Sequence, residues 1–160
     1  MNTISADLTN ITLNSQIIFM DHNNFTGGLP HILANVIYLN LSHNSFFGPI
    51  SPLFCHMLSR ENSLDYLDKS SNLLTGGVPH CWEYWKGLSF LLMENNKLTG
   101  EIPPSMTSFI DLIILDLSTI SLSGKFSLDL SNVTNLEFIN LRENNFFGDV
   151  PTKMPDGMEV

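Results

Sequence analysis

A single pattern recurs six times along this chain of 160 residues. It is leucine-x-leucine-x-x-asparagine-x-leucine-x-glycine with conservative replacements, and four copies continue to an aliphatic residue followed by proline. The last three steps between asparagine positions are 24 residues each. A fixed period of this length indicates stacked repeat units, none of which buries its apolar face alone. The asparagine positions are Asn23, Asn44, Asn72, Asn96, Ile120 and Asn144.

Each position of the pattern has a structural reason. The two leucines alternate with period 2, so both side chains point inward from a short parallel strand. The glycine permits a positive φ at a sharp bend. The asparagine side chain can bond backbone groups of an irregular return, and stacked asparagines then form a ladder. A second inward row lies eight residues before the asparagine, at Val36, Leu64, Leu88, Leu112 and Leu136.

The pattern predicts an α/β-type leucine-rich repeat solenoid. We expect a right-handed superhelix of about six 24-residue repeats, with a parallel β-sheet on the concave face and 3-10 or irregular returns on the convex face. Glycine and proline at fixed offsets argue against a leucine-rich helix bundle. We expect one domain over residues 1–160 without N- or C-terminal caps, and a helical turn in the longer return at 54–62. The repeats fall at about 12–32, 33–60, 61–84, 85–108, 109–132 and 133–156.

Two positions depart from the pattern. Lys69 stands at an inward strand position where leucine is expected, and burying an ammonium group is costly. We therefore expect that its side chain reaches back to water or that the strand is distorted. Ile120 replaces the ladder asparagine, so the fifth repeat interrupts the ladder. The expected cost falls on stability and leaves the fold class unchanged.

The composition excludes several functions. Lys and Arg number 7 against 16 Asp and Glu, for a net charge of -9, which is opposite to that of a protein binding nucleic acid or anionic membranes. The apolar stretches are far shorter than the roughly 20 residues of a membrane span. Residues 1–10 lack the basic and apolar regions of a signal peptide. Without motifs for nucleotide, metal-hydrolase or serine-hydrolase chemistry, we expect neither an enzyme nor a cofactor.

The repeat endings, such as Leu98–Pro103 (LTGEIP), resemble the plant-specific extracellular class of leucine-rich repeat. Four further segments resemble the late ectodomain of plant receptor-like proteins of the defence or elicitor type. The resemblance covers nearly the whole chain, although the family's cysteine-containing N-terminal cap and membrane span are not in it, so the chain resembles an ectodomain fragment. The segments are Phe46–Ser51 (FFGPIS), Phe54–Cys55, Leu64–Asn72 (LDYLDKSSN) and Pro79–Trp85 (PHCWEYW).

The resemblance implies a ligand-binding module at the extracellular, apoplastic face of the plasma membrane, active in defence or developmental signalling. Its implied partners are a peptide or protein ligand and a co-receptor kinase. Two alternatives stay open. One is a secreted inhibitor of a pathogen cell-wall-degrading enzyme, similar to polygalacturonase-inhibiting proteins. The other is an inactive truncated product.

The outward strand positions predict the binding surface, because a solenoid presents them together on its concave face. Four residues before the asparagine and two residues before it, these positions carry several acidic side chains. Such a surface suits a basic or mixed peptide, and an ordinary solvated face without a ligand is the alternative. The candidate ligand-binding residues are Phe19, Asp21, Asn40, Asp68, Glu94, Asp116, Asn140 and Arg142.

The two cysteines, Cys55 and Cys81, lie at similar places in consecutive returns. Neighbouring strands of a sheet are about 4.8 Å apart, which is within reach of a disulfide, so we expect a bridge if the chain is secreted. The flanking His56 and His80 suggest zinc as an alternative, but adjacent residues point apart and the spacing does not match zinc motifs.

Four tripeptides match the acceptor pattern for N-glycosylation, in which any residue except proline and then Ser or Thr follow the asparagine. They begin at Asn10, Asn24, Asn40 and Asn132. Asn40 lies in a predicted strand, so its glycan would project from the concave face.

Overall fold

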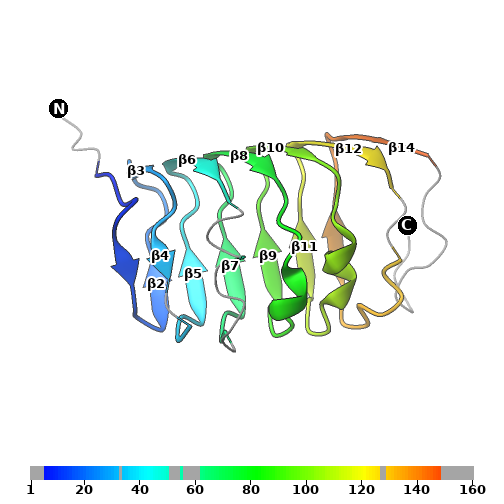
Figure 1. The fold of residues 1–160 in the computed structure, drawn as a ribbon, viewed down its shortest axis with the longest axis horizontal. Helices are drawn as coiled ribbons and strands as arrows, with labels where there is room; N and C mark the ends of the chain where they lie inside the picture. Colours follow the sequence, from blue (N-terminus) through cyan, green and yellow to red (C-terminus); the bar gives the residue numbers. More distant parts are fainter. Residues whose placement is uncertain (1–5, 33, 51–54, 56–61, 127–128, 149–160) are drawn as a thin grey trace.

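The computed structural model describes residues 6–32, 34–50, 55, 62–126 and 129–148. Each repeat forms one coil, and the coils stack along the long axis from β3 (Thr26–Gly27) at one end to β14 (Asn145–Phe147) at the other (Figure 1). We number the coils 1 to 6 by their strand in the first of two six-stranded parallel sheets. The predicted leucine-rich repeat solenoid is therefore confirmed.

The first sheet follows the leucine-x-leucine pair, and its order is β13-β11-β9-β7-β5-β2. The strands are β2 (Ile17–Phe19), β5 (Tyr38–Asn40), β7 (Tyr66–Asp68), β9 (Phe90–Leu92), β11 (Ile114–Asp116) and β13 (Phe138–Asn140). The middle residue of every strand points inward, and these six residues pair in one continuous register. They are Ile18, Leu39, Leu67, Leu91, Leu115 and Ile139.

These inward side chains fuse into one apolar core. Leu39, Leu67 and Leu91 are fully buried, and the predicted second inward row is also buried. Because each coil supplies only a few core side chains, the core exists only through the stacking of neighbours.

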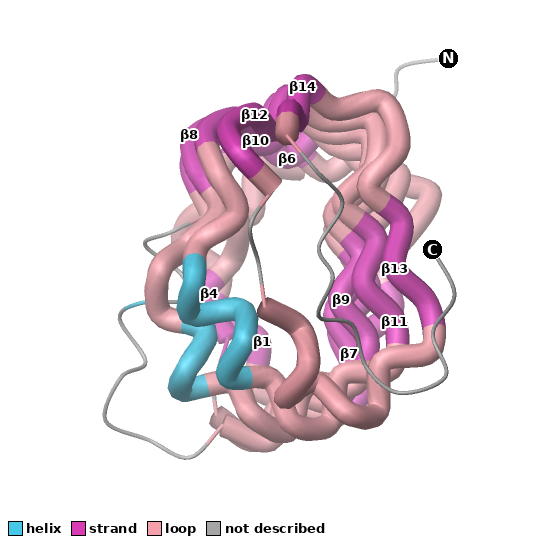
Figure 2. Tube along the Cα trace, turned by 90° about the vertical axis from the view of Figure 1, so that its right-hand side faces the viewer, coloured by secondary structure: helices cyan, strands magenta, loops and turns pink. Residues whose placement is uncertain are grey.

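A second parallel sheet, with the order β14-β12-β10-β8-β6-β3, was not predicted from the sequence. It forms where each coil leaves the asparagine turn. Its strands begin one to three residues after the asparagine position of the repeat. Figure 2 shows this sheet next to the first one around the core, with the 3-10 helices on the side away from the first sheet. The strands are β3 (Thr26–Gly27), β6 (Ser45–Pro49), β8 (Leu73–Gly77), β10 (Lys97–Gly100), β12 (Ser121–Lys125) and β14 (Asn145–Phe147).

Two left-handed positions shape each coil. The repeat glycine has a positive φ in all six coils, as expected, with values such as 89° at Gly100. The residue before the ladder position also has a positive φ, for example 54° at Asn95 and 52° at Thr119. Left-handed backbone is unfavourable for a residue with a β-carbon, so the stack must hold these turns in place.

In the part of the chain that the structure describes, the returns opposite the first sheet contain two 3-10 helices, η1 (Trp82–Tyr84) and η2 (Pro104–Ser108). In η1 the Trp82 ring is buried and its centroid lies 5.5 Å from that of Phe109. Trp85 is buried as well, so both tryptophans pack in the core. A short parallel pair, β1 (Thr12–Leu13) with β4 (His31–Ile32), joins the first returns. The helical turn predicted within 54–62 lies largely outside the described residues.

Cys55 and Cys81 form a disulfide with their Cα atoms 5.6 Å apart, which confirms the predicted bridge. It ties the return of coil 2 to the return of coil 3. Both thiols are used in this bond, so the zinc alternative loses its thiolate ligands. His80 is exposed, and His56 lies outside the described residues.

Both expectations for Lys69 are wrong. Its side chain is fully buried, so it does not reach water. The strand is also regular: the Lys69 N–H donates to the Leu92 carbonyl at 2.9 Å, as the Leu41 N–H does to Asp68 one coil earlier. Stacking neighbours on both sides hold the backbone in register, and burial lowers the pKa of the Lys69 amine well below its usual value.

The predicted asparagine ladder is present. Asn72 Nδ2 donates to three carbonyls, one of them on Leu41 in the preceding coil, and its Oδ1 accepts the Phe46 N–H at 3.0 Å. Asn44, Asn96 and Asn144 repeat this arrangement. Ile120 is buried at the same position and offers no amide, so the ladder is interrupted in coil 5.

Candidate functional site on the first sheet

The outward residues of the first sheet form three rows that cross the strands. Because side chains alternate along a strand, the residues flanking the buried middle residue both point away from the core. The first residues of the strands make one row and the third residues a second row. A third row lies two residues further on, in the segment that leads to the asparagine turn. The second and third rows contain all the candidate ligand-binding residues predicted from the sequence.

A local turn fixes the second row in place. Asp68 Oδ1 accepts the N–H of Ser70 at 2.9 Å, and Asn40 Oδ1 accepts both the N–H and the hydroxyl of Ser42 at 3.0 and 2.7 Å. Asp116 makes the same pair of bonds in coil 5. Asp and Asn readily bond the backbone two residues on, so either residue suits this row.

Three of the predicted acidic residues gather at the middle of the sheet, in coils 3, 4 and 5. Asp68 is buried, and Glu94 and Asp116 are half-buried. Burial raises the pKa of Glu94 above its usual value, and the charges of Asp116 and Asp68 raise it further. Hydrogen bonds from its own backbone N–H and from Ser70 offset part of this rise. Glu94 Oε2 is buried and has no hydrogen-bond partner among the described residues. We call Asp68, Glu94 and Asp116 the acidic cluster.

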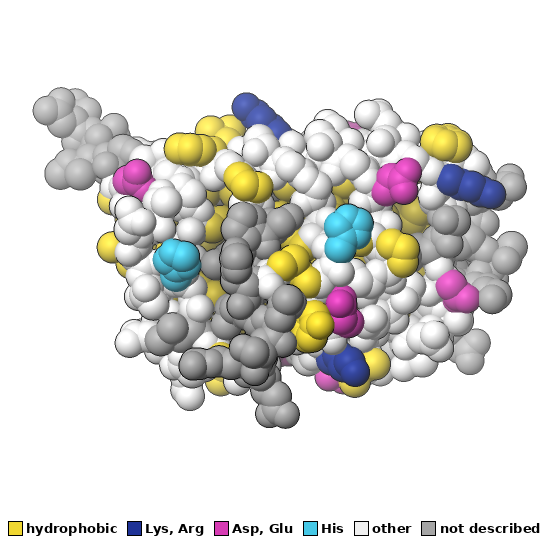
Figure 3. Space-filling view, in the orientation of Figure 1, with side chains coloured by type: hydrophobic (Ala, Val, Ile, Leu, Met, Phe, Trp, Pro, Cys, Tyr) yellow, Lys and Arg dark blue, Asp and Glu magenta, His cyan; other side chains and the backbone are white. Residues whose placement is uncertain are grey.

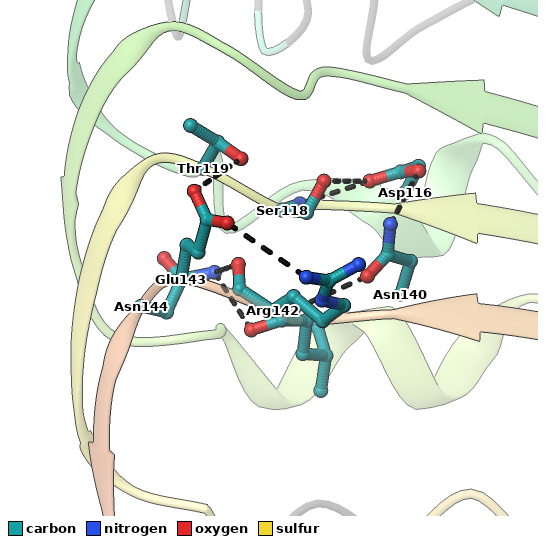
Figure 4. Close-up of polar contacts among 8 residues, drawn as sticks. Asp116, Ser118, Thr119, Asn140, Arg142, Glu143 and Asn144 are labelled. Atoms are coloured by element: carbon teal, nitrogen blue, oxygen red, sulfur yellow. Dashed lines mark hydrogen bonds and ion pairs between the residues drawn. The ribbon is translucent and has the colours of Figure 1, made fainter.

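The remaining predicted residues lie toward the two ends. Asp21 is separated from the acidic cluster by coil 2, where Asn40 and Ser42 occupy the corresponding positions. In coil 6, Asn140 Nδ2 donates to Asp116 Oδ2 at 2.9 Å and extends the polar network (Figure 4). Arg142 is 82% exposed and lies 3.9 Å from Glu143, a contact that contributes little to stability at an exposed site.

The first row was missed in the sequence analysis, and every one of its side chains is apolar or aromatic. Tyr38 and Tyr66 stack with ring centroids 4.0 Å apart, and Tyr66 lies 5.6 Å from Phe90. Burial raises the pKa of Tyr66, with further contributions from its hydrogen bond to Tyr38 and from nearby Asp68. We call this row the apolar row. Its residues are Ile17, Tyr38, Tyr66, Phe90, Ile114 and Phe138.

The return face differs from the first sheet. In Figure 3 its charged side chains are of both signs and lie among polar and apolar groups. Of the predicted glycosylation acceptors, Asn10, Asn24 and Asn132 are exposed, whereas Asn40 is half-buried on the first sheet.

None of the helices in the described segments is long and apolar enough to cross a membrane.

Comparison with known proteins agrees with this architecture. The family model for the leucine-rich repeat matches residues 35–57 and 87–109. Receptor-like protein 35 of Arabidopsis thaliana is 30% identical over 83% of this chain and 14% of its own length. Receptor-like protein EIX2 of Solanum lycopersicum is 28% identical over 94% of this chain and 17% of its own length. The chain thus spans about one sixth of these relatives or less.

Among solved structures, the Arabidopsis receptor kinase HAESA, in complex with the peptide hormone IDA and the co-receptor SERK1, superposes with a TM-score of 0.75. It is 31% identical, over 82% of this chain and 22% of HAESA. The sequence identity to these receptor-like proteins and the stacked parallel strands support the same assignment. The chain is a leucine-rich repeat protein, and it belongs with the repeat ectodomains of plant receptor-like proteins.

Proposed function

We propose that this chain is a ligand-recognition module of a plant cell-surface receptor-like protein and that its first sheet binds a basic or mixed peptide or protein segment. The acidic cluster carries the proposal. It holds three carboxylates on adjacent coils, one of which keeps a buried oxygen without a hydrogen-bond partner among the described residues. A cationic side chain lying over the half-buried Glu94 would pair with its carboxylate and relieve the mutual repulsion of the three carboxylates.

The likeness to HAESA supports a peptide as the ligand class, because that receptor was solved with a peptide hormone. The same structure contains a co-receptor, which supports a co-receptor kinase as the second partner of this protein. Under this proposal the chain works at the extracellular face of the plasma membrane, in defence or developmental signalling. It binds its ligand and performs no chemistry on it.

An extracellular location makes the four acceptor asparagines available for glycosylation. Glycans on Asn10, Asn24 and Asn132 would extend from exposed sites. A glycan on Asn40 would instead lie on the first sheet in coil 2, next to the acidic cluster.

The proposal is tested by measuring fluorescence anisotropy of labelled peptides of equal length with the purified chain. One peptide alternates lysine with serine, a second alternates glutamate with serine, and a third contains only serine and glycine. We expect the basic peptide to bind most tightly, with an affinity that falls as salt is added because exposed charges are screened over about 10 Å at 0.1 M salt. Equal binding of the basic and acidic peptides would overturn the proposal.

The matched variant is Asp68→Asn combined with Glu94→Gln. Asn40 occupies the same row as Asp68 and bonds the N–H two residues on in the same way, so asparagine preserves the turn while it removes the charge. Asp116 is left intact because its Oδ2 accepts a hydrogen bond from Asn140, which a new amide would disturb. We expect this double variant to lose at least about tenfold in affinity for the basic peptide. An unchanged affinity would rule out the acidic cluster as the binding site.

A further inference from the structure

The apolar row is an unusual feature for a solvated sheet. It places one apolar or aromatic side chain on each of six adjacent strands, in continuous register. Its two ends are well exposed, with Ile17 at 61% and Phe138 at 48%. Scattered apolar side chains are normal on a protein surface, whereas a contiguous row marks a contact site.

The ring geometry limits what this row can bind. The Tyr38 and Tyr66 rings lie within 4° of parallel with centroids 4.0 Å apart, so each covers a face of the other. Phe19 lies 4.9 Å from Tyr38 on its other flank. Cations bind the faces of aromatic rings, and here Tyr38 and Tyr66 cover one face of each other. Phe19 of the second row lies against Tyr38, and Phe90 lies against Tyr66. Besides the Tyr38 and Tyr66 hydroxyls, which hydrogen-bond to each other, the row therefore offers ring edges and aliphatic groups, which suit apolar side chains.

The acidic cluster lies on the other side of the same surface. Within a coil, the second row lies two residues, or about 6.6 Å, from the apolar row. The third row lies four residues, or about 13 Å, from the apolar row. A ligand that lies along the stack over the second row therefore meets the apolar row along one edge and Glu94 and Asp21 of the third row along the other edge. Asp68 and Asp116 lie beneath it in the second row. Six strands at about 4.8 Å spacing extend roughly 24 Å, the length of about seven residues of extended peptide.

We propose that the first sheet selects an extended peptide segment in which apolar and basic residues alternate. In an extended chain successive side chains point to opposite sides. A peptide backbone lying over the second row directs one set of side chains to the apolar row and the other set toward Glu94 and Asp21. The net charge of -9 and the acidic cluster supply the complementary charge. This inference rests on the proposed function and names its ligand class.

The test compares three seven-residue peptides, each flanked by glycine and serine for solubility. The first is Leu-Lys-Leu-Lys-Leu-Lys-Leu, which alternates. The second, Leu-Lys-Lys-Leu-Leu-Lys-Leu, has the same composition with a helical spacing. The third replaces every leucine of the first by serine. We expect the alternating peptide to bind at least about tenfold more tightly than either of the other two, because only it buries its leucines on the apolar row while pairing its lysines.

Two variants address the row directly, and folding is checked by circular dichroism. Phe90→Ser removes a central ring that contacts Tyr66. Phe138→Ser removes a largely exposed ring, so the fold should tolerate it. The matched control is Phe147→Ser, which removes a 65% exposed ring on the second sheet. We expect both row variants to weaken binding of the alternating peptide at least about fivefold and the control to leave it unchanged.

The outcomes separate this inference from the proposed function. If the alternating and helical peptides bind equally well, or if Phe138→Ser matches Phe147→Ser, the apolar row plays no part and the inference is overturned. The acidic cluster then still stands, provided that the Asp68→Asn and Glu94→Gln variant loses the basic peptide. If none of the lysine peptides binds, both the inference and the proposed function are overturned.

Discussion

At the scale of single residues, Lys69 is the strongest departure from the repeat. Its side chain occupies a fully buried inward position between coils whose equivalent residues are Leu41 and Met93. Burial in an apolar setting disfavours the charged amine, which is why its pKa falls well below 10.5. Folding must therefore either desolvate an ammonium group or release its proton. Both cost free energy that a leucine or methionine at this position would not.

We predict that Lys69→Met raises the free energy of unfolding at neutral pH by about 1–3 kcal/mol. This difference in stability between the variant and the wild type should become smaller as the pH rises. At pH values between the lowered pKa of Lys69 in the folded state and about 10.5, the unfolded wild type binds more protons than the folded wild type. The stability of the wild type therefore rises with pH in this range, whereas the variant has no amine at this position and lacks this pH dependence. Urea unfolding of both proteins at pH 7 and pH 9.5 measures the difference. A variant less stable than the wild type at pH 7 would show that the amine contributes a favourable contact.

At the scale of elements, the asparagine ladder joins neighbouring coils at the turn. The Asn72 side chain bonds groups of two coils at once. The Asn23 side chain is exposed and, among the described residues, donates only within its own coil, to Met20 and Asp21. The two residues have the same place in the repeat and differ in burial and in the number of groups they satisfy. They form a matched pair for measuring the ladder.

We predict that Asn72→Ala lowers the free energy of unfolding by about 3 kcal/mol, because it leaves buried backbone groups without partners. Asn23→Ala should cost no more than about 1 kcal/mol, since water can replace its exposed bonds. Chemical denaturation of the two variants gives both numbers. Similar losses would mean that the ladder acts through the local turn and not through contacts between coils.

The elements also show what could be predicted from the sequence. The first sheet and its core follow from apolar residues with period 2, and the positive φ of Gly100 follows from the absence of a side chain. The second sheet could not be predicted in this way, because strands such as Lys97–Gly100 have no apolar alternation and pair only when stacking aligns them. The positive φ of Thr119 likewise reflects the stack, since threonine does not favour it.

The binding surface was predicted in part for a related reason. The acidic residues are visible in the sequence as outward positions near the asparagine. The apolar row is outward too, but tyrosine and phenylalanine at a strand start are equally typical of a buried face. Only the register of Tyr38, Tyr66 and Phe90 across the strands shows that the rings form one surface.

At the scale of the whole molecule, stability should be distributed as in a one-dimensional stack. Leu91 in coil 4 is fully buried between strands on both sides, whereas Ile139 in coil 6 is half-buried and its strand has one neighbour in the first sheet. Removing a central side chain weakens two interfaces between coils. Removing the terminal one weakens a single interface.

We therefore predict that Leu91→Ala costs about 2–5 kcal/mol and that Ile139→Ala costs clearly less. Two probes distinguish the mechanisms. Trp82 and Trp85 both lie in the return of coil 3, so their fluorescence reports on the middle of the stack, while circular dichroism reports on all coils. In Ile139→Ala the dichroism signal should change at lower urea than the fluorescence, because coil 6 opens first. In Leu91→Ala the two transitions should move together. Coincident transitions and equal losses in both variants would instead indicate a single cooperative unit in which the position of a coil has no effect.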